Sequence, residues 1–96
     1  MNNGEMLQIL KHDLQLTTTA NDDYLVKLLE ASKKLIEREG VTLENTGIEG
    51  DLIVCHYAAY LFRKRASSET AMPKFLRREL NNLLLSQKGE IDSDNI

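Results

Sequence analysis

Residues 21–40 read NDDYLVKLLEASKKLIEREG, and this stretch decides the fold class of the chain. Its apolar residues recur at intervals of three and four, which places them on one face of a helix. Gly40 follows at the position where a left-handed residue commonly ends a helix. The pattern predicts an amphipathic helix over residues 20–39. Its inward stripe consists of Leu25, Leu28, Leu29, Ser32, Leu35 and Ile36.

The polar start of this helix, TTTANDD (residues 17–23), resembles either a helix cap or an acidic metal site. Thr19 and Asp22 have the spacing of a capping box, with Asp in place of the usual Glu or Gln. Asp22 and Asp23 then lie in the first turn, where negative charge offsets the helix dipole. A calcium loop needs more oxygen ligands at alternate positions and a distal glutamate. We therefore expect a structural role for both aspartates.

Helical patterns continue on both sides of this stretch. Residues 5–16 are amphipathic and stop at three β-branched threonines, which continue a helix poorly. Residues 49–64 contain LIVCHYAAYLF, which is apolar on nearly every face, as in a buried helix. Residues 73–87 begin with Pro73, a favourable first helical residue, and end before Gly89.

A chain of 96 residues forms one domain at most. A domain of this size buries a modest core, and such domains often gain stability by association. We expect an all-α fold, a compact bundle of about four helices at roughly 5–16, 20–39, 49–64 and 73–87. The single helical domain covers residues 1–88. Residues 89–96 are expected to form a disordered, flexible polar tail.

Composition excludes several classes of protein. The start MNNGEMLQIL lacks the pattern of a signal peptide, and the uncharged stretch 52–62 is too short to span a bilayer. We therefore expect no membrane contact. A single cysteine, Cys55, excludes an internal disulfide and fits a reducing compartment.

The charges are distributed unevenly along the chain. Residues 1–60 carry five basic and ten acidic side chains, whereas residues 61–88 carry seven basic and two acidic ones. A bipolar molecule of this kind suits head-to-tail association or contact with an acidic partner, although a solvated surface is equally consistent. The candidate contact residues for a neighbouring subunit, a partner protein or DNA are Arg63, Lys64, Arg65, Lys74, Arg77 and Arg78.

Catalytic and metal-binding patterns are sparse. Cys55 and His56 are adjacent, so on a helix their side chains point about 100° apart and do not form a nucleophile–base pair. Two histidines and one cysteine do not make a zinc site, and Gly47 and Gly50 precede no Lys-Ser/Thr of a phosphate loop. We expect no enzyme, no catalytic or metal-ligating residue and no cofactor.

Nucleic-acid binding is the strongest chemical alternative. The six basic candidates flank one connection and can contact phosphates without sequence preference. Against this, the chain is acidic overall, with a sequence pI near 5.3, and no stacking aromatics interleave with the basic residues. The linker 41–50 is also too long for a helix-turn-helix.

The order of parts resembles a known family. A leading helix, MLQILKHDLQL, precedes TTTANDDYLVKLLEASKKLI, a glycine-containing linker, the tyrosine-rich LIVCHYAAYLFRKR and the final PKFLRRELNNLLLSQKG. Over about residues 6–88 this resembles the small phage head–tail connector proteins, also called head-completion or DNA-packaging proteins. The segment RKRASSETAMPKFLRREL is more basic than is usual for that family.

The resemblance implies a structural role in the virion, at the head–tail junction, after assembly in the bacterial cytoplasm. The protomers would form a homo-oligomeric ring below the portal protein. The ring would extend the DNA channel, help retain packaged DNA through non-specific contact and bind a neck or tail-completion protein. One alternative is a small helical regulatory or nucleic-acid-binding protein. Another is a helical module of a complex unrelated to phage.

Overall fold

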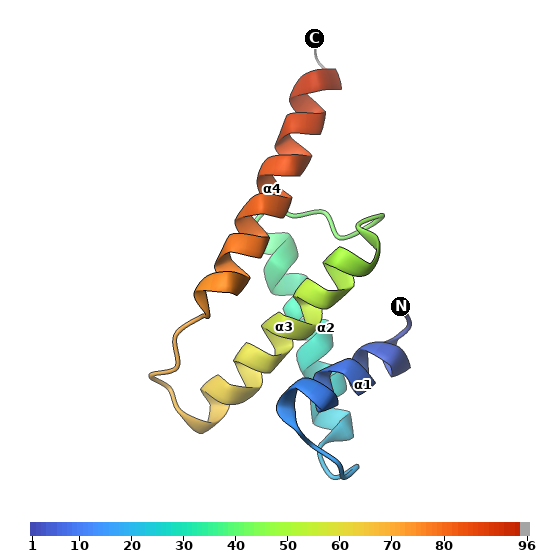
Figure 1. Cartoon of the computed structure of the whole chain (residues 1–96), viewed down its shortest axis with the longest axis vertical. Coiled ribbons are helices and arrows are strands. Elements are labelled where there is room, and N and C mark those ends of the chain that lie inside the picture. Colours follow the sequence, from blue (N-terminus) through green and yellow to red (C-terminus); the bar gives the residue numbers. More distant parts are fainter. Residues whose placement is uncertain (95–96) are drawn as a thin grey trace.

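The structure, a computed structural model, describes residues 1–94 and the side chains of residues 1–88. These residues form four helices: α1 (Asn3–Leu14), α2 (Asp22–Arg38), α3 (Gly47–Ala66) and α4 (Lys74–Asp94) (Figure 1). The predicted all-α bundle is thus confirmed, and each predicted helix has its counterpart. The molecule is elongated, with extents of 52 × 30 × 18 Å.

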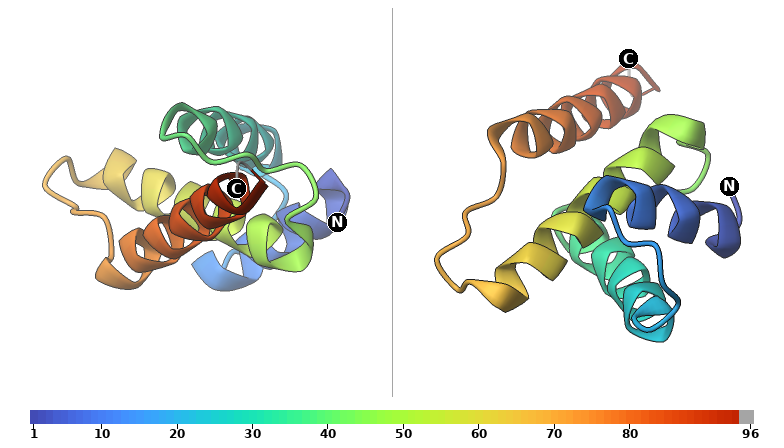
Figure 2. Two further views of the ribbon diagram at one scale, coloured as in Figure 1. Left: turned by 90° about the horizontal axis from the view of Figure 1, so that it is seen from above. Right: turned by 60° about the horizontal axis from the view of Figure 1, so that its bottom comes forward.

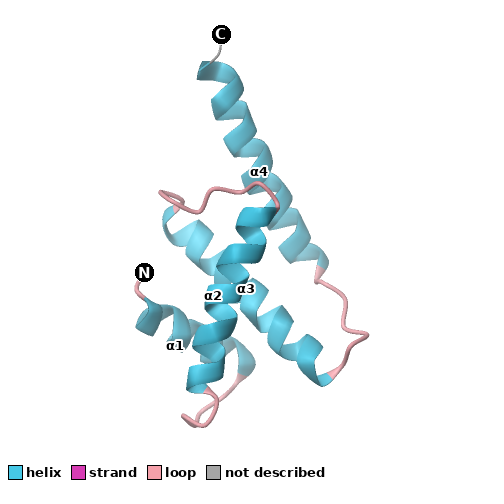
Figure 3. Ribbon diagram, turned by 180° about the vertical axis from the view of Figure 1, so that it is seen from behind, coloured by secondary structure: helices cyan, strands magenta, loops and turns pink. Residues whose placement is uncertain are grey.

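Helix α3 is the centre of the bundle. It packs against each of the other three helices, and its contact with α2 is the most extensive of these (Figure 3). Residues on several of its faces are buried, as its continuous apolar sequence predicts. The buried residues of α3 are Gly50, Ile53, Val54, Cys55, Tyr57, Ala58 and Ala59.

The remaining helices contribute one inward stripe each. Met6 and Leu10 come from α1, and Leu76 and Leu80 come from α4. In α2, Ser32 is buried among leucines and its hydroxyl donates a hydrogen bond of 2.7 Å to the carbonyl oxygen of Leu28. This bond satisfies the polar atom within its own helix, so Ser32 fits the apolar stripe.

The expected capping box at the start of α2 is wrong. The N-cap residue is Asn21, and no side chain caps this helix end. Asp22 instead forms an ion pair of 2.9 Å with the ammonium group of Lys11, which is almost fully buried on α1. The aspartate therefore ties two helices together, and a buried cation requires such a partner.

At the other end of α2, Gly40 has a φ angle of +102°, as predicted for the residue that ends this helix. Helix α1 ends at Leu14 rather than at residue 16, because Gln15 takes the left-handed conformation before the threonines begin. Helix α4 begins at Lys74, so Pro73 precedes it, and the carbonyl oxygen of Pro73 accepts hydrogen bonds from the amides of Leu76 and Arg77.

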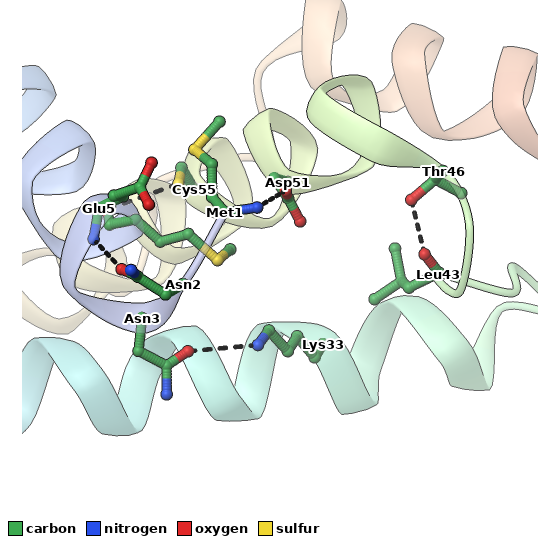
Figure 4. A network of polar contacts seen from close by, with 10 residues as sticks. Met1, Asn2, Asn3, Glu5, Lys33, Leu43, Thr46, Asp51 and Cys55 are labelled. Carbon is green, nitrogen blue, oxygen red and sulfur yellow. Dashed lines mark hydrogen bonds and ion pairs between the residues drawn. The ribbon is translucent and has the colours of Figure 1, made fainter.

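The N-terminus lies against the first half of α3 (Figure 4). Its ammonium group contacts a carboxylate oxygen of Asp51 at 2.8 Å, and this contact raises the pKa of the amine. Asn2 caps α1 by accepting a hydrogen bond of 2.8 Å from the amide of Glu5. These contacts hold the start of α1 across the bundle.

Helix α4 projects beyond the other three helices (Figures 1 and 2). Its main contact is with α3, and this is the least extensive of the four principal helix pairs. The helix continues to Asp94 instead of ending at residue 87. A glycine inside a helix costs only about 1 kcal/mol, and no proline follows Gly89 to stop the helix. Residues 95–96 and the side chains of residues 89–94, on which the expected flexible tail falls, lie outside the described residues.

Candidate functional site

The six basic residues predicted as contacts do not form one continuous patch. Arg63, in the last turn of α3, contacts Asp13 of α1, with a guanidinium–carboxylate distance of 3.5 Å. Arg77 is also engaged within the molecule, because it forms an ion pair with Glu39 at the end of α2. The hydrogen bond with Glu39 raises the pKa of the Arg77 guanidinium. These two arginines therefore serve contacts within the bundle.

The other four predicted cations have no carboxylate partner among the described side chains. Lys64 and Arg65 lie in the last turn of α3, and Lys74 and Arg78 lie on one face of the first turns of α4. All four are exposed. The end of α3 and the start of α4 flank the connection 67–73 at one end of the bundle (Figure 1). We call these four residues, Lys64, Arg65, Lys74 and Arg78, the basic end.

Aromatic rings accompany two of these cations. The guanidinium carbon of Arg65 lies 4.8 Å from the ring centre of Tyr24 and 5.0 Å from that of Phe62. The ammonium group of Lys64 lies 5.6 Å from the ring centre of Tyr60. Although no stacking aromatics interleave with the basic residues in the sequence, folding brings Tyr24 of α2 to the end of α3, beside Arg65.

A groove of opposite charge lies between α4 and the α2–α3 connection. It has a volume of about 680 Å³, and Leu83 and Leu84 of α4 line it together with three glutamates and one cation, Lys88. Glu39 holds Arg77. Glu44 and Glu49 are exposed and form no ion pair with any described side chain. We call this feature, lined by Glu39, Glu44, Glu49, Leu83 and Leu84, the acidic groove.

Exposed apolar side chains flank both features. Ile48 and Leu85 are 67% and 65% exposed, the highest fractions among the large hydrophobic side chains that the structure describes, and they adjoin Glu49 and Leu84 of the acidic groove in sequence. Phe75 and Tyr24 are 48% and 37% exposed; Tyr24 packs against Arg65 of the basic end, and Phe75 follows Lys74 in sequence. Exposed apolar groups beside charged ones are typical of protein contact surfaces.

A second groove, between α1 and α3, contains the residues with the most reactive side chains. Its volume is about 420 Å³, and its lining includes His12, Asp13, Cys55 and His56. The Cys55 thiol is buried and faces the carbonyl oxygen of Met6 at 3.6 Å. Burial raises the pKa of this thiol to about 11, so the thiol stays protonated at neutral pH. A protonated thiol is a poor nucleophile.

His56 of this groove faces α4 rather than Cys55. Its Nδ1 atom lies 3.6 Å from a carboxylate oxygen of Glu79, and its ring meets the edge of Phe75 at a centroid distance of 5.3 Å. In the part of the chain that the structure describes, no three histidine, cysteine or acidic side chains gather as a metal site would require. The groove therefore does not combine a nucleophile with a base.

None of the four helices, as described, has both the length and the apolar character needed to cross a membrane.

Comparison with known proteins does not indicate what these surfaces bind. No protein-family model matches the chain, and no curated protein or solved structure is significantly similar to it.

The acidic groove was not predicted from the sequence. Glu39, Glu44 and Glu49 are spaced at five residues across a helix end, a connection and the next helix start. No helical or strand period links them, and only the position of α4 turns them into one surface. The excess of acidic residues before residue 61 was the one available signal.

Proposed function

We propose that this chain is a structural subunit of a phage head–tail connector. In this role it forms a ring below the portal protein, extends the DNA channel, helps retain packaged DNA and offers a binding surface to a neck or tail-completion protein. It acts by binding and ring closure, without a chemical step. The protein belongs to the head–tail junction of the virion after assembly in the host cytoplasm.

The observation that carries this proposal is the projecting helix α4. Its stripe of Leu76, Leu80 and Leu83 is buried on the bundle, yet Leu85 is exposed and the helix extends past its neighbours (Figure 1). A projecting helix with an exposed leucine is a suitable arm for a neighbouring subunit. The resemblance of the sequence to head–tail connectors agrees with this role, and the exposed cations of the basic end can contact a neighbouring subunit or another acidic partner.

The decisive test is deletion of the gene from a phage or prophage that carries it, followed by electron microscopy of the lysate. We expect separate heads and tails, with heads that have lost their DNA. Complementation by the intact gene should restore complete particles. Normal infectious virions from the deletion strain, or a gene neighbourhood without capsid genes, would contradict the proposal.

One observation favours a second candidate, a small helical regulatory or nucleic-acid-binding protein. Tyr24 and Phe62 lie against Arg65, and proteins that bind single-stranded nucleic acid combine cations with aromatic rings in this way. A salt titration distinguishes the candidates. A dedicated binder holds DNA at physiological salt with an affinity that falls steeply as salt rises. An isolated connector subunit should bind DNA weakly or not at all.

A further inference from the structure

We infer that the basic end of one protomer docks into the acidic groove of a second copy of this chain. The inference rests on the proposed function, because it specifies which surfaces join neighbouring subunits of the ring. It commits Lys64, Arg65, Lys74 and Arg78 to a subunit contact rather than to DNA or the portal.

Within one molecule, Glu49 of the groove lies far from Lys64 and Arg65 of the basic end. Glu49 lies in the first turn of α3, and Lys64 and Arg65 lie in its last turn. A rise of 1.5 Å per residue separates Glu49 from Lys64 by about 22 Å along the helix axis. This separation exceeds the Debye length in water at physiological salt, so the attraction between the charges is largely screened. A second copy is therefore needed to bring them together.

The groove already binds one arginine. Both terminal nitrogens of the Arg77 guanidinium donate to the carboxylate of Glu39. Nη1 bonds to Oε1, and Nη2 lies 3.3 Å from Oε2, so the ion pair is bidentate. Arginine and carboxylate favour this geometry. Glu44 and Glu49 line the same groove, and neither forms an ion pair with a described side chain, including Lys88, which also lines the groove. Arg78 and Arg65 of a neighbouring copy have the chemistry to bind them.

Apolar complementarity supports the same pairing. Five large hydrophobic side chains are exposed in the described part of the chain. Of these, Tyr24 packs against Arg65 of the basic end. Two leucines, Leu83 and Leu84, line the groove. Bringing the surfaces together would bury apolar area of Tyr24 and of Leu83 and Leu84 in the groove. Burial of apolar area supplies affinity, and the surrounding charges set orientation and partner choice.

A contact between two different surfaces is heterologous, so it repeats from one copy to the next. It closes into a ring when the rotation per subunit divides a full turn. The contact also requires no two-fold axis. Both properties agree with the ring of the proposed function.

Charge reversal at each surface provides the test. The groove-reversed variant carries Glu44→Lys and Glu49→Lys, and the end-reversed variant carries Lys74→Glu and Arg78→Glu. All four side chains are exposed and have no ion-pair partner among the described residues. Acidic residues in the first turns of α4 also suit the helix dipole. A third variant with Glu30→Lys and Lys34→Glu changes exposed charges on α2 that line neither surface, and is the control.

Self-association is measured by sedimentation at low salt, with protein up to about 1 mM, where even contacts of millimolar dissociation constant are visible. We expect the wild-type chain and the control to associate, and higher salt to weaken the association. Each reversed variant alone should associate at least about tenfold more weakly, because like charges then face each other. An equimolar mixture of the two reversed variants should associate again, since each can bind only the other.

Three results would overturn the inference: a wild-type chain that stays monomeric throughout, reversed variants that associate like the wild type, or a mixture that fails to regain association. Circular dichroism of each variant verifies that the helices are intact. Failure of this contact is distinguishable from failure of the proposed function. If the gene deletion blocks head completion but both reversed genes complement it, the connector role stands and this contact does not.

Discussion

The carboxylate of Glu39 and the guanidinium of Arg77 join the end of α2 to the second turn of α4 across 38 positions of sequence. Both partners are partly open to water, at 30% and 45% side-chain exposure. The pair bridges two helices whose direct packing is slight. It therefore positions α4 beside the acidic groove while it adds little to global stability.

Replacing Arg77 by alanine tests this position. Because exposed ion pairs contribute little, we expect the free energy of unfolding to fall by only about 0.5–1 kcal/mol, measured by urea denaturation. In the Arg77→Ala variant, amide hydrogen exchange should accelerate relative to the wild type more in α4 than in α2 or α3. The control is Arg78→Ala, an exposed neighbour without an ion-pair partner among the described residues, expected within about 0.5 kcal/mol of the wild type. Equal losses in both variants would mean that Glu39 contributes nothing.

The packing of α4 depends on few side chains. Leu80 is 1% exposed between α4 and the bundle, whereas Leu85 on the same helix is 65% exposed. We expect Leu80→Ala to lower the free energy of unfolding by about 2–5 kcal/mol, as for other buried leucines. Leu85→Ala should leave it within about 0.5 kcal/mol. Thermal and urea unfolding compare the two, and a similar effect of both would contradict the assignment of the buried face.

The elements that follow a strong local period were predictable from the sequence. The stripe of α2 and the continuous apolar surface of α3 reflect burial against neighbouring helices, and Gly40 has the positive φ that its position after a helix requires. Boundaries were harder. Gln15 ends α1 early, and α4 continues through Gly89, because helix ends depend on single residues and on tertiary contacts.

The candidate site was predictable only in part. All six basic residues are surface side chains, but in the folded chain Arg63 forms an ion pair with Asp13 and Arg77 forms one with Glu39. These pairings join residues far apart in sequence, so no spacing rule reveals them. Asp22 shows the same limit. Its position in a first turn predicts that it caps the helix, whereas its carboxylate forms an ion pair with the buried ammonium group of Lys11.

The buried thiol of Cys55 makes the stability of the fold sensitive to alkali. Burial raises its pKa from 9.0 to about 11. Between these values the unfolded chain carries a thiolate while the folded chain keeps the neutral thiol. The unfolded state then binds fewer protons, so stability is complete below pH 9 and declines as pH rises toward 11.

Urea denaturation across this pH window measures the decline. In Cys55→Ser the contribution of this thiol to the pH dependence should disappear, although the variant itself is expected to be less stable. A thiol reagent should also label the native protein slowly near pH 8 and rapidly in denaturant. Rapid labelling of the native protein would contradict the burial of this side chain.

The first turn of α3 accommodates a side chain from the preceding connection only because residue 50 is glycine. A Cβ atom at Gly50 would lie 1.8 Å from Oγ1 and 2.6 Å from Cβ of Thr46. The Thr46 hydroxyl donates a hydrogen bond of 2.6 Å to the carbonyl oxygen of Leu43, which keeps this side chain in place. An added methyl group therefore has to displace the connection that forms one wall of the acidic groove.

We expect Gly50→Ala to lower the free energy of unfolding by about 1–3 kcal/mol, the usual cost of forcing a group into a filled space. The higher helix propensity of alanine offsets at most about 1 kcal/mol of this. Thr46→Gly removes both clashing atoms, so the double variant Thr46→Gly/Gly50→Ala should be more stable than the sum of the single changes predicts. Urea denaturation of all four proteins gives this coupling. Additive effects would show that the α2–α3 connection moves freely away from α3, and the acidic groove would then lack a fixed wall.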